Sequence, residues 1–242
     1  MRLIARLVLA VSLLAACGSG DGSDDGAVVF AASSLVDVLS DLSADDESAF
    51  SGAVLSFASS ASLAAQVIDG APVDLIISAD RAQIDELVAV GFGTSEPQVV
   101  AQNVLVIAVE VGNPLGITSL DDLSRSDVLL AVAAPGVPLG EYSEAMLAAA
   151  NVQVSPVTFE ADARAVLAKV ILGEVDAGIV YATDAESSDD VELIEIVEGD
   201  EVSVEYVALQ LSDGSDRAVE LLEELLGDRG QQALARRGFG LP

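Results

Sequence analysis

Two segments of the chain place serines between an apolar strand and a helix. Residues 30–35 are Phe-Ala-Ala-Ser-Ser-Leu, and residues 57–63 are Phe-Ala-Ser-Ser-Ala-Ser-Leu. The first N–H groups of a helix lack partners within it, and with the helix dipole they bind anions without lysine or arginine. A serine hydroxyl adds a further donor. The same serines could simply cap their helices, and both interpretations stay open, although the repetition strengthens the case for an anion site.

Three more segments place hydrogen-bond donors at the ends of predicted elements. Residues 136–142, Gly-Val-Pro-Leu-Gly-Glu-Tyr, predict a turn that leaves backbone N–H groups free near Leu139. A helix is predicted to begin at Asp162, and an apolar strand from Gly178 ends at Tyr181. Ligands of open parallel sheets bind beyond the carboxyl ends of the strands. Tyr181 taken alone is also typical of the edge of a core.

The residue types that the chain lacks exclude several kinds of chemistry. It contains no histidine and a single cysteine, so Ser-His and Cys-His catalytic pairs are excluded, and a transition-metal site would need carboxylates alone. No phosphate-binding loop of the G-x-x-x-x-G-K-[ST] type is present. A hydrolase built on Ser34 or Ser60 would have to use Lys169, the only lysine. We therefore expect a binding protein rather than an enzyme, with no cofactor.

The charge balance is strongly acidic. Ten Lys and Arg residues face 40 Asp and Glu residues, which gives a formal net charge of −30. Nucleic-acid binding needs a basic surface, and anionic membranes attract basic segments, so both classes of partner are excluded. The acidic residues are scattered along the chain, which favours a role in solubility over a single acidic binding patch.

The N-terminus has the pattern of an export signal. Arg2 and Arg6 precede a short apolar run that is well below the roughly 20 residues a membrane-spanning helix needs. The sequence Leu-Ala-Ala-Cys at 14–17 resembles the bacterial lipobox, which implies a signal peptide over 1–16 and lipidation of Cys17. Residues 17–26 are rich in Gly, Ser and Asp, as in a flexible tether. The alternative is a plain cleaved signal with an incidental cysteine.

The rest of the chain alternates predicted strands and helices. Such a rhythm predicts an α/β protein with mostly parallel, helix-covered sheets. The continuous apolar run 104–109 predicts a strand buried on both faces. The predicted strands are 28–31, 54–58, 75–77, 104–109, 129–133, 178–181 and 202–211, and the predicted helices are 35–42, 63–68, 80–90, 141–150, 162–172 and 216–226.

The positions of two strand-like runs predict two lobes. The run 104–109 follows about three strand–helix units, and the run 202–211 returns near the end of the chain. We expect one lobe from 27–103 with 205–242, a second lobe from 104–204, and two crossing strands that act as a hinge. A cleft between two such lobes is a favoured ligand site, and hinge closure is its usual motion.

Several of these segments together resemble the ModA family, the molybdate-binding proteins of bacterial ABC importers. The matching runs follow the family order over essentially the whole mature chain. The resemblance implies the two-lobed fold of type II periplasmic binding proteins. The runs are Ala-Ala-Ser-Ser-Leu at 31–35, Phe-Ala-Ser-Ser at 57–60, Gly-Ala-Pro-Val-Asp-Leu-Ile-Ile-Ser-Ala-Asp at 70–80, Pro-Leu-Gly-Glu-Tyr at 138–142, Ile-Val-Tyr-Ala-Thr-Asp-Ala at 179–185 and Gly-Phe at 238–239.

The resemblance also implies which residues hold a tetrahedral dianion, molybdate or tungstate. Ser34 and Ser60 would donate through their hydroxyl and N–H groups, and Tyr181 through its phenol. Leu139 and Ala163 would donate through backbone N–H groups, so their side chains need not match the family. It further implies a monomer held on the outer face of the cytoplasmic membrane. A permease and an ATPase, supplied by other chains, would transport the solute that this receptor delivers.

A receptor for another small anion, such as sulfate, thiosulfate or an organic acid, is the alternative. Sulfate, like molybdate, only accepts hydrogen bonds, so cavity size would have to exclude it, whereas monohydrogen phosphate carries a proton that a site of donors alone penalises. A carboxylate ligand normally calls for an arginine clamp. Arg164 is the only basic residue within a candidate site segment.

Overall fold

The computed structural model describes residues 26–196, 204–211 and 216–242. The predicted signal peptide, Cys17 and all of the predicted tether except Gly26 lie outside these residues and stay predictions. Within the described part of the chain, no helix combines the length and the apolarity needed to cross a membrane.

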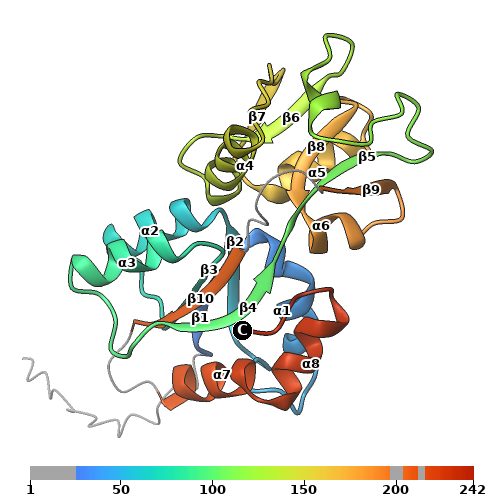
Figure 1. Ribbon diagram of the computed structural model, residues 1–242. Helices are drawn as coiled ribbons and strands as arrows, with labels where there is room; N and C mark the ends of the chain where they lie inside the picture. Colours follow the sequence, from blue (N-terminus) through green and yellow to red (C-terminus); the bar gives the residue numbers. More distant parts are fainter. Residues whose placement is uncertain (1–25, 197–203, 212–215) are drawn as a thin grey trace, which may run out of the picture.

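A first sheet has the strand order β2-β1-β3-β10-β4 (Figure 1). Successive residues of β1 and β3 face opposite sides of this sheet: Val29 and Leu75 pack with α1, α7 and α8, and Phe30 and Ile76 pack with α2 and α3. The strands are β1 (Val28–Ala32), β2 (Val54–Ala58), β3 (Leu75–Ser78), β4 (Gln98–Asn103) and β10 (Val204–Gln210), and the helices are α1 (Val36–Ser43), α2 (Ser60–Ile68), α3 (Arg81–Ala89), α7 (Asp216–Leu226) and α8 (Asp228–Arg236).

A second sheet has the order β7-β6-β8-β5-β9. Strand β5, which lies between β8 and β9, is buried from Leu105 to Val109, and this confirms the prediction of a strand covered on both faces. The strands are β5 (Leu105–Glu110), β6 (Leu130–Ala133), β7 (Thr158–Glu160), β8 (Ala177–Tyr181) and β9 (Val191–Glu195), and the helices are α4 (Pro138–Ala149), α5 (Ala163–Ile171) and α6 (Ala182–Glu186), with a 3-10 turn at Asp121–Ser124.

A single residue, Val104, separates the two sheets along the chain. β4 ends at Asn103 in the first sheet and β5 begins at Leu105 in the second, and Figure 1 shows this extended segment passing from one half of the molecule to the other. The chain returns to the first sheet after β9, and β10 lies between β3 and β4. The residues 197–203, which link β9 to β10, lie outside the described part of the chain.

The prediction of mostly parallel sheets was wrong. β1 pairs in parallel with β2 and β3, and β6 with β7 and β8, but both neighbours of β10 and both neighbours of β5 are antiparallel to it. The reason is the path of the chain. β5 and β10 each enter their sheet from the other half of the molecule, so they run opposite to strands that end facing that half.

Helices facing the space between the sheets begin earlier than the apolar pattern predicted. α2 begins at Ser60 rather than at 63, and α4 begins at Pro138 rather than at 141. A 3-10 turn at Ser33–Leu35 precedes α1. The first turn of α2 contains two serines, and that of α4 contains a proline and a glycine, so the helical periodicity of apolar residues becomes recognisable only one turn later. The sequence reading also missed β4, β7, β9, α6 and α8.

Candidate functional site

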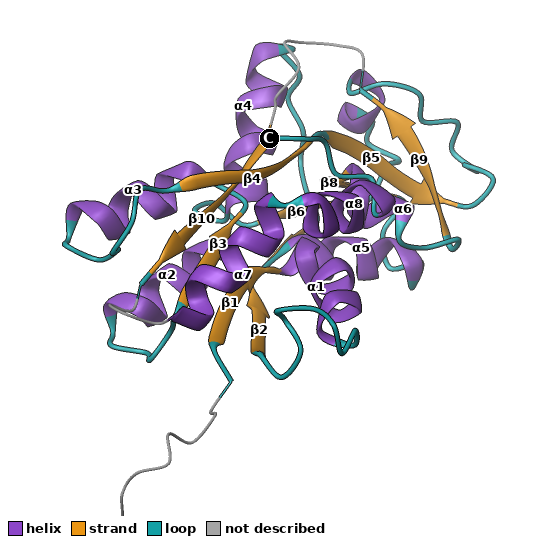
Figure 2. Ribbon diagram, turned by 90° about the horizontal axis from the view of Figure 1, so that it is seen from below, coloured by secondary structure: helices purple, strands orange, loops and turns teal. Residues whose placement is uncertain are grey.

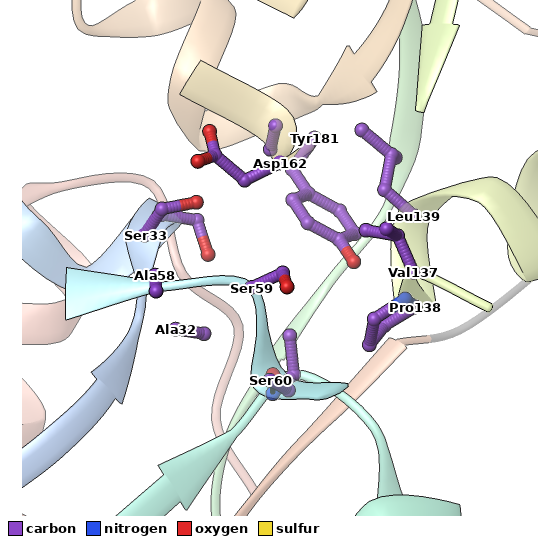
Figure 3. A pocket seen from close by; sticks show the side chains of 13 residues that line it. Ala32, Ser33, Ala58, Ser59, Ser60, Val137, Pro138, Leu139, Asp162 and Tyr181 are labelled. Carbon is purple, nitrogen blue, oxygen red and sulfur yellow. Dashed lines mark hydrogen bonds between the residues drawn. The ribbon is translucent and has the colours of Figure 1, made fainter. Parts of the chain in front are cut away.

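One cavity lies where the carboxyl ends of strands from both sheets meet (Figure 3). Segments after β1, β2 and β3 enclose it from the first sheet, and segments after β6, β7 and β8 enclose it from the second. All five residues predicted for the site line it, and each is at most 3% exposed. The lining residues are Ala32, Ser33, Ser34, Ala58, Ser59, Ser60, Ala79, Val137, Pro138, Leu139, Asp162, Ala163 and Tyr181.

The start of α2 presents Ser60 to the cavity. Ser59 caps this helix, because its Oγ accepts the N–H of Ser62 at 3.3 Å. The first bond of the helical ladder runs from Leu63 N to Ser59 O, so the N–H of Ser60 precedes that ladder. The Oγ of Ser60 accepts a bond from Ala79 N at 3.0 Å, which uses a lone pair and leaves the hydroxyl hydrogen free to donate.

α4 contributes backbone donors only. Pro138 occupies its first position, and the first ladder bond runs from Glu141 N to Val137 O. The N–H groups of Leu139 and Gly140 therefore stay outside the ladder, as the sequence predicted for this turn. A side chain on Gly140 would place its Cβ 2.3 Å from Ala134 O, so only glycine lets this first turn pack against the loop after β6.

α5 begins in the same way but carries an acidic cap. The carboxylate of Asp162 accepts the N–H of Ala165 at 2.9 Å, and the N–H of Ala163 lies ahead of the ladder. Asp162 is the one charged side chain among the lining residues, and the sequence had placed it only at a helix start. In Figure 3 its carboxylate turns away from the hydroxyl end of Tyr181. The donors therefore face the centre of the cavity, whereas the carboxylate of Asp162 accepts a hydrogen bond from the first turn of its own helix.

Tyr181, the last residue of β8, supplies the donor opposite the serines. Its phenol oxygen points toward the side on which Ser59 and Ser60 lie (Figure 3). Burial raises the pKa of Tyr181 well above the usual value of 10.0, with smaller contributions from Tyr206 and Tyr142. The phenol therefore keeps its proton at neutral pH and can donate it in a hydrogen bond.

Ser34 is held by a partner that the sequence reading missed. Its Oγ lies 2.7 Å from the phenol oxygen of Tyr206 on β10, and both side chains are buried. Asn103, the last residue of β4, donates from Nδ2 to the same phenol oxygen at 3.3 Å. The signal in the sequence was one tyrosine inside a mostly apolar strand, but nothing local indicates that β10 passes behind the serines.

Arg164 does not enter the cavity. Its Nε lies 2.8 Å from Oδ1 of Asp184, and its Nη2 pairs with Asp37 at the start of α1. Asp37 and Asp184 thus hold the one guanidinium that could have clamped a carboxylate ligand. This arrangement disfavours an organic acid as the solute.

Neither a serine hydrolase nor a metal centre is supported by the geometry. The ammonium of Lys169 pairs with Glu174 at 2.6 Å near the end of α5, and Lys169 is not among the residues around Ser34 and Ser60. Among the described residues, no group of three or more Cys, Asp or Glu side chains is placed to hold a metal ion. The cavity offers donors, and donors of this kind bind an anion.

Comparisons with known proteins decide the family. The family model for bacterial extracellular solute-binding proteins matches residues 27–240. A molybdate-binding protein ModA from Mycobacterium tuberculosis is 33% identical over 246 residues, which cover 96% of this chain and 94% of that protein. The chain belongs to the ModA family of solute-binding proteins.

A second ModA protein supports this assignment, and a solved structure shows the same fold. The molybdate-binding protein ModA of Escherichia coli is 31% identical over 231 residues, which cover 90% of each chain. The sulfate-binding protein SubI of Mycobacterium tuberculosis superposes with a TM-score of 0.75 over 88% of this chain and 86% of that chain, at 17% identity. The second likeness shows the fold alone, and it confirms the two-lobed periplasmic-binding-protein architecture. A ModA protein is a binding protein and not an enzyme.

Proposed function

We propose that this protein captures molybdate, and also tungstate, for an ABC importer. The observation that carries the proposal is the convergence of uncharged donors from both halves on one buried cavity. Ser34 and Ser60 come from the first half, and Leu139, Ala163 and Tyr181 come from the second. No lysine or arginine is among the residues that line the cavity.

Donors of this kind suit a fully deprotonated dianion. Molybdate at neutral pH accepts hydrogen bonds and offers none, so each of its oxygens can be matched by an N–H or O–H group. Hydrogen bonds to a charged group contribute about 1.5–3 kcal/mol each, and several together reach on the order of 10 kcal/mol before the cost of closure. The starts of α2, α4 and α5 add the favourable ends of three helix dipoles.

The size of the cavity favours a compact solute. The volume open to the centre of a water molecule is about 10 Å³, which is room for about one water. A tetrahedral oxyanion, with five heavy atoms, would need the halves to move slightly apart from this arrangement, and a sugar or a peptide would need far more room. Because the surrounding residues are buried, we also infer that the two halves must separate before a solute can enter.

Sulfate is the main competing solute. It has the same charge and the same hydrogen-bonding character as molybdate, so a donor-lined cavity does not exclude it by chemistry. The shared fold of SubI, a sulfate-binding protein, gives the alternative its support. The ModA proteins of Mycobacterium tuberculosis and Escherichia coli, both molybdate-binding proteins, are 33% and 31% identical to this chain, whereas SubI is 17% identical, and this difference is the basis on which we place molybdate first.

The proposed setting follows from the family and from the N-terminus. We propose that a permease and an ATPase on other chains take the solute from this receptor. Cys17 would hold the protein, as a monomer, to the outer face of the cytoplasmic membrane through a lipid. Residues 27–103 with 205–242 would move as one lobe, and residues 104–204 as the other.

Calorimetry with a panel of anions tests the function directly. The purified protein is titrated with molybdate, tungstate, sulfate and phosphate, and each anion is also scored by the rise in melting temperature that binding produces. We expect saturable binding of molybdate and tungstate, much weaker binding of sulfate, and the weakest binding of phosphate. A preference for sulfate would favour the competing receptor, and no binding of any of the four would refute an oxyanion receptor.

A further inference from the structure

A row of buried polar side chains stands behind Ser34, and we call it the Tyr206 network. Ser34 Oγ lies 2.7 Å from the phenol oxygen of Tyr206. Asn103 Nδ2 donates to that same oxygen at 3.3 Å and to Thr183 Oγ1 at 2.9 Å. All four side chains are at most 5% exposed. Buried groups of this kind are costly unless they are bonded, so their mutual contacts are strongly favoured.

The direction of the hydrogen bonds follows from Asn103. Its Oδ1 accepts the N–H of Val104 at 2.9 Å, which fixes the carbonyl end of the amide. The other end is an NH₂ group, and such a group can only donate. Tyr206 therefore accepts a hydrogen from Asn103, and the single hydrogen of its own phenol is free to be donated to Ser34.

This direction of the hydrogen bonds determines where the hydroxyl hydrogen of Ser34 can point. If Tyr206 donates to Ser34 Oγ, then one lone pair of that oxygen is used and the hydrogen of Ser34 must point elsewhere. Ser34 lines the cavity and also borders a second cavity beside Asp37 and Arg164, and a bound oxyanion is the acceptor that the first cavity would offer to this hydrogen. Burial raises the pKa of the Tyr206 phenol, so it keeps the hydrogen that this arrangement needs.

Tyr206 also touches the donor on the opposite side of the cavity. Its ring packs edge-on against Tyr181, with the two ring centroids 6.2 Å apart, and against Phe239 at 5.2 Å. One residue of β10 thus contacts both a donor of the first half, Ser34, and a donor of the second half, Tyr181. Asn103 stands at the end of β4, where the chain leaves the first sheet.

We propose that Tyr206, set by Asn103, is a positioning residue that turns the hydroxyl hydrogen of Ser34 toward the bound oxyanion. The proposal rests on the function proposed above. Tyr206 itself is not among the residues that line the cavity, so the effect of its hydroxyl on the solute passes through the bond to Ser34.

A double-mutant cycle tests whether the effect of Tyr206 on binding passes through Ser34. Molybdate affinity is measured by calorimetry for the wild type, Tyr206→Phe, Ser34→Ala and the double variant. Tyr206→Phe keeps the ring and its packing and removes only the hydroxyl. We expect it to weaken binding by about five- to thirtyfold, the size of one charge-assisted bond that is misdirected or lost. In the Ser34→Ala background the same change should have almost no effect, because the hydroxyl that Tyr206 orients is absent.

The control is Tyr142→Phe, which removes the hydroxyl of a half-buried tyrosine outside the network, and we expect less than a twofold change. Melting temperatures without ligand check that each variant is folded. If Tyr206→Phe is unfolded, Asn103→Ala takes its place, since it removes the donor that sets Tyr206, and its effect should also vanish in the Ser34→Ala background.

The outcomes separate the two proposals. If the wild type binds none of the four anions of the panel, the proposed function fails. If the wild type binds molybdate and Tyr206→Phe weakens binding equally with and without Ser34, the effect does not pass through Ser34 and the positioning role is refuted. Unchanged affinity of Tyr206→Phe would refute it as well.

Discussion

Arg164 Nε lies 2.8 Å from Oδ1 of Asp184, whose side chain is fully buried. The same guanidinium reaches Asp37 at the start of α1, which packs on the first sheet, while Arg164 itself belongs to α5 on the second sheet. One side chain therefore joins the two halves directly beside Ala163. We interpret the cluster of Arg164, Asp184 and Asp37 as a link between the two halves that lies beside the cavity without lining it.

Removal of Arg164 should affect stability more than solute recognition. Arg164→Met leaves Asp184 buried without its cation, and we expect a loss on the order of 2 kcal/mol at pH 8. This loss is below that of a fully buried pair, because the guanidinium is partly exposed. The melting temperature should fall by several degrees, whereas molybdate affinity should fall by less than about tenfold.

The matched control for this variant is Lys169→Met on the same helix, which breaks only the pair with Glu174 near the surface. Exposed pairs of this kind contribute little, so this variant should melt close to the wild type. If Arg164→Met abolishes binding while Tyr181→Phe does not, Arg164 clamps the anion. That result would favour the alternative function, a receptor for a different small anion.

Asp184 should make stability depend on pH. Burial raises its pKa to about 7, although Arg164 lowers it in part. Between its unfolded value near 3.8 and about 7, the folded state holds a proton that the unfolded state has released. Stability from this group therefore falls as pH rises through that window, by about 1.4 kcal/mol per pH unit. Asp184→Asn should remove this fall, so its stability relative to the wild type should increase from pH 4.5 to 7.

Urea unfolding at several pH values measures the effect. The control is Asp85→Asn, an exposed change of the same type on α3, which should give a curve parallel to that of the wild type. A parallel curve for Asp184→Asn would show that the carboxyl is ionised throughout this range.

Tyr181 should be the most informative single donor to remove. Tyr181→Phe keeps the buried ring and removes one hydrogen bond to a charged solute, so we expect molybdate affinity to fall by about ten- to a hundredfold. Calorimetry measures the change, and Tyr142→Phe again serves as the matched control. Equal affinities for wild type and Tyr181→Phe would mean that the phenol does not contact the solute.

Asp162 is the one lining residue whose charge opposes the proposed ligand. Asparagine also caps helices well, so Asp162→Asn should retain the start of α5 while removing a negative charge next to the anion. We expect molybdate affinity to rise by about two- to tenfold, more at low salt than at high salt. Asp85→Asn changes the net charge equally at a distance from the cavity and should leave affinity nearly unchanged. A loss of affinity in Asp162→Asn would mean that the carboxylate helps to hold the solute.

The local patterns of the chain predicted much of the candidate site. Each predicted site segment lies at the end of an apolar strand or at the start of a helix, and both are short-range signals that depend on a few adjacent residues. The paired serines of two segments were found because they follow two strands in the same way, and the turn near Leu139 because Pro138 lies between two glycines ahead of a predicted helix. The resemblance to the ModA family then indicated Ser34, Ser60 and Ala163 among the residues of these segments. Helix boundaries were placed late where the first turn is polar or contains proline and glycine, since such a turn lacks the apolar periodicity of the rest of the helix.

Residues that act across long separations in the chain could not be predicted. Tyr206 lies 172 positions from Ser34, and nothing next to either residue indicates the contact. The pairing of Arg164 with Asp37, 127 positions away, has the same character. Among many acidic residues of similar surroundings in sequence, only packing determines which two meet the guanidinium.

The sequence by itself determined the donor groups, because strand ends, helix starts and the absence of histidine are properties of neighbouring residues and of composition. The tertiary structure alone decided that these donors share one cavity, that Arg164 is held outside it, and that Tyr206 stands behind Ser34. The physical reason is that the chain enters β5 and β10 from the opposite half of the molecule, which makes each of them antiparallel to its neighbours. This path of the chain brings together segments that are far apart in the sequence, and nothing in the sequence of either segment indicates that they are close in space.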